Sequence, residues 1–165
     1  NALLILVPRH PQRFDAVKSL LHKKSIEFAE RSKGDVPGDG HDVFLVDTLG
    51  ELQRFYAASD VAFVGGSLVP VGGHNLLEPA VLGLPVLSGP HTHNAQEIAD
   101  LLQQAGAVEI VSDAEGLGRG VSALFDDPAH ARDVGARSEA AVARSRGAVD
   151  RLVAMVEPLL NSRAG

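Results

Sequence analysis

The chain has 165 residues, of which 45% are hydrophobic and 22% charged, and this suits one globular domain or one lobe of a larger protein. A formal net charge of -6 excludes a nonspecific nucleic-acid binder, because such a protein needs a basic face. The chain has no cysteine, which excludes disulfide frameworks and thiolate metal sites. No apolar run approaches the ~20 residues that cross a bilayer.

The predicted elements alternate between strands and helices. Apolar runs predict strands at residues 3–7, 25–29, 43–46, 61–64, 85–87 and 108–111. Amphipathic stretches predict helices at residues 13–23, 49–58, 76–82, 95–104, 114–125, 129–144 and 149–160. This alternation predicts an α/β fold with a Rossmann-like, doubly wound, parallel six-stranded sheet. Residues 1–165 are expected to form a single domain with C-terminal helices over about 128–160.

The start of the chain suggests what surrounds it. The sequence opens "NALLILVPRH", with an apolar strand under way at once and no initiator methionine. Because a native protein rarely begins inside a buried strand, we expect this chain to be the C-terminal lobe of a longer protein.

Unusual residues gather after four predicted strands. These segments are "PRHPQRF", "DTLGEL", "GGSLVPVGGHN" and "SGPHTHN", at residues 8–14, 47–52, 65–75 and 88–94. In a doubly wound sheet, ligands bind beyond the carboxyl ends of the strands. The sequence therefore predicts that these loops form a ligand site.

Two glycine pairs flank the third of these loops. Gly66 ends a strand together with its neighbour, and Gly73 leads through His74 and Asn75 into a helix. Glycines let backbone N–H groups approach a ligand, and a helix start favours an anion. The spacing matches neither the dinucleotide nor the P-loop pattern. The alternative is a tight connection that only needs positive φ angles.

Glu78 has two interpretations. Asn75 and Glu78 have the spacing of a capping box, in which the carboxylate bonds to the backbone N–H of the capping residue. Pro79 favours a later helix start, which would leave Glu78 at the helix mouth as a ligand for ribose hydroxyls.

Other polar residues in these loops are candidates for anion or sugar contacts. Arg9 can clamp a phosphate or carboxylate, and His10 can add a donor. After the fifth strand, His91 and Asn94 are either ligand contacts or, for Asn94, a helix cap. His74, His91 and His93 lie in the third and fourth of these loops, but no carboxylate pattern accompanies them, so we expect no metal.

No catalytic pair is evident. Ser67 lacks a nucleophile-elbow motif and an obvious base partner. The carboxylates Asp47 and Glu51 are more easily interpreted as caps or ribose ligands. We therefore expect a lobe that binds a negatively charged nucleotide donor, with the catalytic base elsewhere.

The segment "FVGGSLVPVGGHNLLEPAVLGLPVLSGPHTHN" closely resembles the matching segment of the 3-deoxy-D-manno-oct-2-ulosonic acid (Kdo) transferases, and "PRHPQRF" resembles their PRHPERF segment. The resemblance implies the C-terminal, donor-binding lobe of a two-lobed GT-B glycosyltransferase, without its N-terminal acceptor lobe. It implies CMP-Kdo as donor substrate, a lipid A precursor as acceptor, a role in lipopolysaccharide inner-core synthesis, and no cofactor. The full-length protein would work at the cytoplasmic face of the bacterial inner membrane.

The resemblance also assigns roles to residues. It implies that the general base is a glutamate on the absent lobe, so no residue of this chain is expected to be catalytic and the isolated lobe should be inactive. The expected donor-binding residues are Arg9, His10, Gly66, Ser67, Gly73, His74, Asn75, Glu78, His91 and Asn94. The family commonly has Glu-Arg where this chain has Pro70-Val71, and Phe where it has His93, which is therefore not among the expected site residues.

Two alternatives remain open at the level of sequence. One is another GT-B enzyme that uses a UDP-sugar, such as a transferase or an epimerase. The other is a nucleotide-binding module without transfer chemistry.

Overall fold

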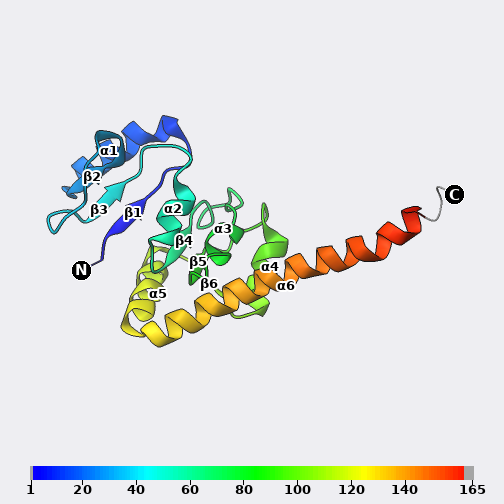
Figure 1. Ribbon diagram of the computed structural model, residues 1–165. Coiled ribbons are helices and arrows are strands. Elements are labelled where there is room, and N and C mark those ends of the chain that lie inside the picture. The colour runs from blue at the N-terminus through cyan, green and yellow to red at the C-terminus, as the bar shows by residue number, and fades with distance from the viewer. Residues whose placement is uncertain (1, 162–165) are drawn as a thin grey trace. The chain divides into compact units, whose positions relative to one another are not determined.

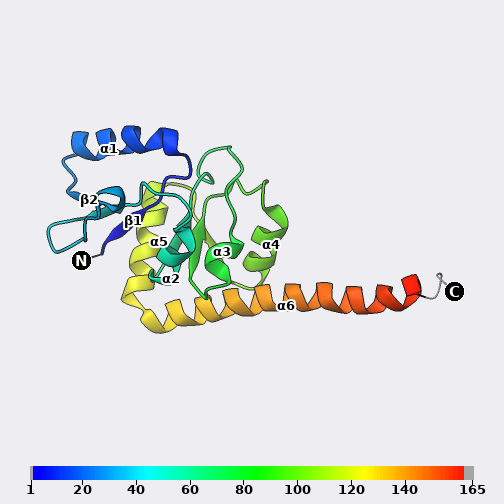
Figure 2. The ribbon, with the colours of Figure 1, turned by 45° about the horizontal axis from the view of Figure 1, so that its top comes forward.

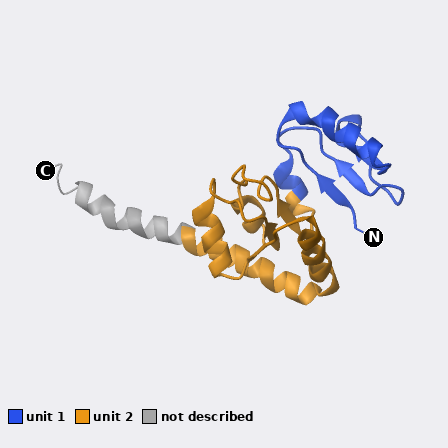
Figure 3. Cartoon of the chain, turned by 180° about the vertical axis from the view of Figure 1, so that it is seen from behind, with its two compact units in different colours: residues 1–55 blue, residues 56–165 orange. Residues whose placement is uncertain are grey.

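The structure is a computed structural model that describes residues 2–161, with side chains described for residues 2–145. Contacts between residues divide the chain into two compact units, residues 1–55 and residues 56–165 (Figure 3). The expectation of a single domain over residues 1–165 stays a prediction.

The first unit is a three-stranded parallel sheet with one long helix. Its elements are β1 (Leu4–Leu6), the 3-10 turn η1 (Pro11–Arg13), α1 (Phe14–Lys23), β2 (Phe28–Glu30), the 3-10 turn η2 (Arg31–Lys33) and β3 (Val43–Leu45) (Figure 1). The strand order is β1-β3-β2. All three residues of β3 are buried because this strand is central and covered on both faces. Helix α2 (Leu52–Ala57) spans the boundary between the units.

The second unit is a parallel sheet of order β4-β5-β6 with helices on both faces. Its elements are β4 (Ala62–Val64), α3 (Leu77–Ala80), β5 (Val86–Ser88), α4 (Gln96–Gln104), β6 (Val108–Ile110), α5 (Ala114–Asp126) and α6 (Pro128–Asn161). Val86 belongs to a core cluster with residues of α3, α4 and α6, whereas Leu87 packs with residues of α5. Successive strand side chains point to opposite faces, so one strand builds both cores.

The α/β class and the six parallel strands of the sequence prediction are confirmed. The single six-stranded sheet is corrected to two three-stranded sheets, because within the described residues no ladder joins β1 to β4. The backbone groups Leu4 N and Leu6 O bond instead on the β3 side, with Asp42 O and Val46 N.

The C-terminal helices also differ from the prediction. Helices were expected at residues 129–144 and 149–160, but α6 is one helix over Pro128–Asn161. The second expected helix lies within these bounds, beyond the residues whose side chains are described. The lone Gly147 between the two stretches costs a helix only about 1 kcal/mol relative to alanine, which does not end it. Among the described residues, no helix is both long and apolar enough to span a membrane.

Helix α6 passes α5, α3 and α4 in turn (Figure 2) and comes very close to the loop before β5. A Cβ atom at Gly135 of α6 would lie 2.0 Å from the carbonyl oxygen of Gly83. Farther along, the buried hydroxyl of Ser138 donates to Ala107 O at 2.9 Å. Backbone contact therefore fixes where the helix packs.

We expect Gly135→Ala to destabilise the protein by roughly 1–3 kcal/mol, the usual cost of overpacking, because backbone atoms must move to admit the methyl group. Gly118→Ala is the matched control, since nothing lies within 4 Å of a Cβ at that helical position. The control should be stabilised by about 0.5–1 kcal/mol. Urea unfolding of the three proteins measures both effects, and equal stability of the two variants would contradict the close contact.

Candidate functional site

Most of the predicted site residues lie in two loops of the second unit that leave neighbouring strand ends. Val64, the last residue of β4, is paired in register with Ser88 of β5. Because the strands are parallel, the loops that follow them begin side by side at the carboxyl edge of the sheet. We call residues 65–76 the first loop and residues 89–95 the second loop.

Ser67 joins the two loops through its hydroxyl and its backbone. The side chain is fully buried; Oγ donates to Val64 O at 2.7 Å and accepts from Gly89 N at 2.8 Å. Ser67 O accepts from His91 N at 3.0 Å. A Cβ at Gly89 would lie 2.2 Å from Ser67 O, so only glycine fits there. The Ser67 hydroxyl is thus hydrogen-bonded within the protein, and this buried residue holds the two loops together.

The glycines of the first loop have the positive φ angles that the sequence suggested. Gly66 and Gly73 both have φ of 72°, and Gly73 N donates to Gly66 O at 2.9 Å, which closes the loop. A Cβ at Gly66 would meet His74 Nε2 at 3.1 Å, so the half-buried imidazole lies against this glycine. At Gly73 a Cβ would be 3.0 Å from His91 O in the second loop. Both glycines therefore permit close packing as well as the turn.

Asn94 fastens the tip of the first loop. Its Nδ2 donates to Val71 O at 3.0 Å, and its backbone N–H donates to Gly72 O at 3.0 Å. The capping alternative for Asn94 is wrong, because the N-cap residue of α4 is Ala95 and no side chain caps that helix. Asn94 is exposed, yet its amide is used to hold one loop to the other.

Glu78 lies in the first turn of α3, half-buried and next to Asn75. Asn75 Oδ1 accepts from Leu77 N at 3.0 Å, and its Nδ2 donates to Glu78 Oε1 at 3.2 Å. The capping box, one of the two interpretations of Glu78, does not form in its usual way: the carboxylate contacts the side-chain amide of Asn75, and Asn75 itself receives the backbone N–H. The later helix start at Pro79 is wrong as well, because α3 begins at Leu77.

Tyr56 was not predicted as a site residue. Burial raises the pKa of its phenol to about 12, with a further contribution from the negative charge of Glu78. The phenol therefore stays protonated and lies within electrostatic range of the carboxylate. Nothing in the sequence pattern marks this tyrosine, because it sits in an ordinary amphipathic helix.

Arg9 and His10 lie in the first unit, exposed on the short loop that follows β1. Pro8 and Pro11 flank them and restrict the backbone on both sides. Arg13 N donates to His10 O at 2.9 Å, which ties this loop to η1 and the start of α1. The two basic residues thus occur together, as predicted, on the carboxyl side of a strand.

Asp47 follows β3 and is buried among polar partners. It accepts from Ser32 N at 2.8 Å and from Ser32 Oγ at 2.6 Å, and Lys18 Nζ lies 2.7 Å away. Burial alone would raise the pKa of Asp47, but hydrogen bonds from Lys18 and Ser32 lower it to about 2. This carboxylate is used inside the protein, a role the sequence did not reveal.

The carboxylate of Glu51 is likewise bonded to partners within the protein. Arg31 binds it with two nitrogens, Nε at 3.2 Å and Nη2 at 2.8 Å, and Thr48 Oγ1 donates to it at 2.5 Å. The hydrogen bond from Arg31, followed by that from Thr48, lowers the pKa of Glu51 to about 2. Of the loop carboxylates considered from sequence, Glu78 has the fewest partners among the described contacts.

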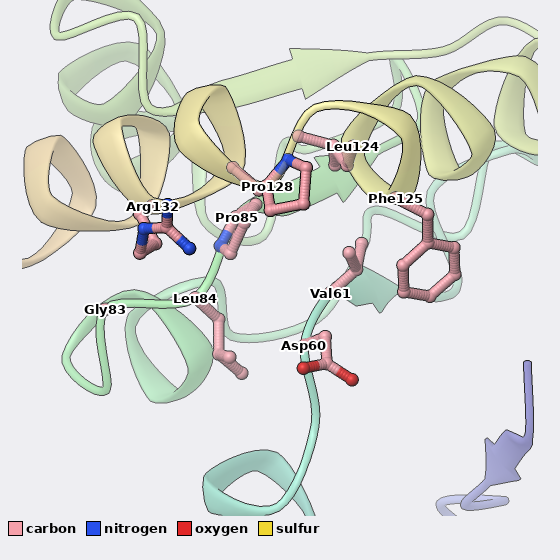
Figure 4. Close-up of a pocket in the computed structure, with 10 residues that line it drawn as sticks. Asp60, Val61, Gly83, Leu84, Pro85, Leu124, Phe125, Pro128 and Arg132 are labelled. Atoms are coloured by element: carbon pink, nitrogen blue, oxygen red, sulfur yellow. The ribbon is translucent and has the colours of Figure 1, made fainter.

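A cavity lies at the amino-terminal edge of the second sheet, opposite the two loops. It has a volume of about 380 Å³ and is lined by residues that precede β4 and β5 and by the ends of α5 and α6 (Figure 4). Asp60 and Arg132 contribute charges to an otherwise apolar wall. None of the predicted site residues lines it. No group of three or more metal-ligating side chains is arranged for a metal ion within the described residues.

The two parallel sheets, with loops of the second unit that meet at the carboxyl ends of β4 and β5, match the C-terminal lobe of a GT-B glycosyltransferase. The chain is 38% identical to the crystallised C-terminal CMP-Kdo binding domain of WaaA from Acinetobacter baumannii, with a TM-score of 0.82. That match covers 85% of this chain and 73% of the solved one.

Longer relatives match as well. The 3-deoxy-D-manno-octulosonic acid transferase of Haemophilus influenzae is 43% identical over 161 residues, covering 97% of this chain and 38% of the relative. That of Bordetella pertussis is 40% identical over 159 residues, covering 96% of this chain and 37% of the relative. No protein-family model matches the chain. The chain belongs to the 3-deoxy-D-manno-octulosonic acid transferase family, and it spans less than two fifths of the length of these two relatives.

The role of Ser67 can be tested by removing one atom. Ser67→Ala leaves Gly89 N–H buried without its acceptor, and we expect it to lower the free energy of unfolding by about 1–3 kcal/mol. Ser112→Ala is the control, because Ser112 is exposed and lies outside both loops. Thermal unfolding with hydrogen exchange of residues 65–76 and 89–95 measures the effect. Unchanged exchange in both loops would contradict the proposed link.

Proposed function

We propose that this chain is the donor-binding lobe of an enzyme that transfers Kdo from CMP-Kdo to a lipid A precursor during lipopolysaccharide inner-core synthesis. Family membership supports the donor, because the similar solved domain is described as a CMP-Kdo binding domain. The single structural observation behind the proposal is the pair of cross-linked loops at the carboxyl edge of the second sheet, beside the half-buried carboxylate of Glu78.

The two loops suit a nucleotide because they combine a close-packed, glycine-containing backbone with very little charge. From Phe63 to Asn94 the one acidic or basic side chain, counting histidine as neutral, is Glu78. Backbone N–H groups beside glycines can approach phosphate oxygens, and the half-buried imidazoles of His74 and His91 can donate hydrogen bonds. Gly66 and Gly73 permit the approach, while Ser67 and Asn94 keep the loops in shape.

Glu78 suits the ribose of the donor. A carboxylate that accepts one weak side-chain bond retains acceptor sites for two vicinal hydroxyl groups. Asn75 orients it, and the protonated phenol of Tyr56 lies near enough to be influenced by its charge. Arg9 and His10 supply positive charge and donors for the phosphate or the sugar carboxylate.

The transfer itself would need the rest of the protein. We infer that the residues of this chain bind and orient CMP-Kdo, and that a glutamate on the N-terminal lobe removes the proton from the acceptor hydroxyl. CMP-Kdo acts as a substrate, so no cofactor and no metal are assigned to this lobe. The acceptor and the cytoplasmic face of the inner membrane belong to the same proposal for the full-length protein.

Calorimetric titration of the chain with CMP, UMP and UDP tests the proposal. We expect CMP to bind with at least tenfold higher affinity than either uridine nucleotide, a difference of about 1.4 kcal/mol. A preference for UDP would instead support a GT-B enzyme that uses a UDP-sugar. Absence of binding to all three at millimolar concentration would overturn the assignment of donor binding to this lobe.

The ribose role of Glu78 gives a sharper test. We expect Glu78→Ala to weaken CMP binding about tenfold or more, the worth of one or two hydrogen bonds to a charged group. Its melting temperature should change little, because Glu78 has one exposed partner. The variant should also lose discrimination between CMP and its 2′- or 3′-deoxy forms.

Glu97→Ala is the control for this experiment, since Glu97 is an exposed carboxylate in the first turn of α4. A large fall in melting temperature of Glu78→Ala with unchanged CMP affinity would show that Glu78 serves the helix start rather than the ligand.

A further inference from the structure

Three ionisable side chains from three elements of the first unit meet at the carboxyl side of its sheet. Lys18 of α1 lies 2.6 Å from Glu30 Oε2, at the end of β2, and 2.7 Å from Asp47 Oδ2, after β3. We call Lys18, Glu30 and Asp47 the ionic cluster. The roles argued above for the loops leave this cluster without a function.

The cluster is mostly shielded from water, so its charges are strongly interdependent. The side chains of Glu30 and Asp47 are 7% and 3% exposed, and that of Lys18 is 25% exposed. Glu30 Oε2 is buried, and the ammonium group of Lys18, 2.6 Å away, is the charge that compensates it. Removing one partner of a buried ion pair leaves the other charge buried and uncompensated.

The lysine is shared between two carboxylates that would otherwise repel each other. The pKa of Lys18 is raised above its usual range by its hydrogen bonds to Asp47 and then to Glu30. Lys33, 64% exposed, also contacts Glu30, but it lies three residues away on the same segment and cannot anchor α1. The Lys18 ammonium group thus fixes α1 against the ends of β2 and β3.

Helix α1 in turn determines where the loop after β1 lies. Arg9 and His10 sit between two prolines, and Arg13 N bonds to His10 O immediately before α1 begins at Phe14. Proline fixes its own φ and restricts the preceding residue, so this loop has little freedom to absorb a shift of the helix. A displacement of α1 would therefore be passed to Arg9.

We propose that Lys18 is a positioning residue for donor binding: by joining α1 to Glu30 and Asp47, it holds the Arg9–His10 loop in the conformation that receives the anionic group of the nucleotide. This inference rests on the proposed function for the role of Arg9. The placement of the loop by the ionic cluster is independent of any ligand.

A double-mutant cycle tests the link between Lys18 and Arg9. Lys18→Met keeps most of the length of the side chain and removes its charge. We expect it to weaken CMP binding about tenfold when Arg9 is present, but less than twofold in an Arg9→Ala background. Lys18→Arg, which keeps the charge, should restore affinity to within threefold of the wild type. Calorimetry at a temperature where every variant is folded gives the affinities.

Two further measurements separate positioning from general stability. Arg119→Met breaks an exposed ion pair with Glu115 and should change CMP affinity less than twofold. If Lys18→Met fails to fold, the triple variant Lys18→Met, Glu30→Gln, Asp47→Asn removes all three charges together and should still weaken CMP binding. Hydrogen exchange at residues 9–13 without ligand should be faster in either variant than in the wild type.

The outcomes are distinct. Equal losses of affinity with and without Arg9 would overturn the proposal, as would wild-type affinity and wild-type exchange at residues 9–13 in a variant with a lower melting temperature. If the wild type does not bind CMP, the proposed function fails, and the exchange experiment alone then decides whether Lys18 positions the loop.

Discussion

Buried backbone groups must find hydrogen-bond partners, and at the carboxyl edge of the second sheet this constraint determines how the two loops pack against each other. The strands β4 and β5 end side by side, and the two loops that leave them, the first of which is glycine-rich, contain no Asp, Glu, Lys or Arg. Their polar groups are satisfied mainly by each other, through Ser67, Asn94 and several N–H to carbonyl bonds. The pair of loops behaves as one preformed surface, and this limits the ordering that a ligand must bring about.

The first unit uses ion pairs, rather than contacts between loops, at the ends of its strands. Three carboxylates at or beyond the ends of β2 and β3 are paired with nearby cations: Lys18 pairs with Glu30 and Asp47, and Arg31 pairs with Glu51. Ion pairs of this kind are sensitive to the loss of either partner, whereas the close backbone contacts between the two loops are sensitive to added side-chain volume. The two units therefore differ in which substitutions disturb them most.

Much of this arrangement could be predicted from local patterns. Apolar runs placed every strand to within three residues at each end, and the rule for parallel sheets identified the loops that matter. The pairing of strands into two sheets could not be predicted, because apolar runs do not specify which strands bond to each other. Ser67 and Asn94 were predicted as donor contacts; the structure shows what holds them, and their contact with a donor stays a prediction. The pairing of Lys18 with Glu30 and Asp47 was missed because the lysine lies 12 or more residues from both carboxylates and looks like an ordinary surface charge in sequence.

The contact between Gly135 and Gly83 has a consequence for how the chain tolerates change. Helix α6 meets the loop before β5 through main chain at this point, so a side chain at position 135 would push the two apart. Because the two main chains touch here, a shift of α6 along its axis by one residue would bring a side chain of the helix against the main chain of Gly83.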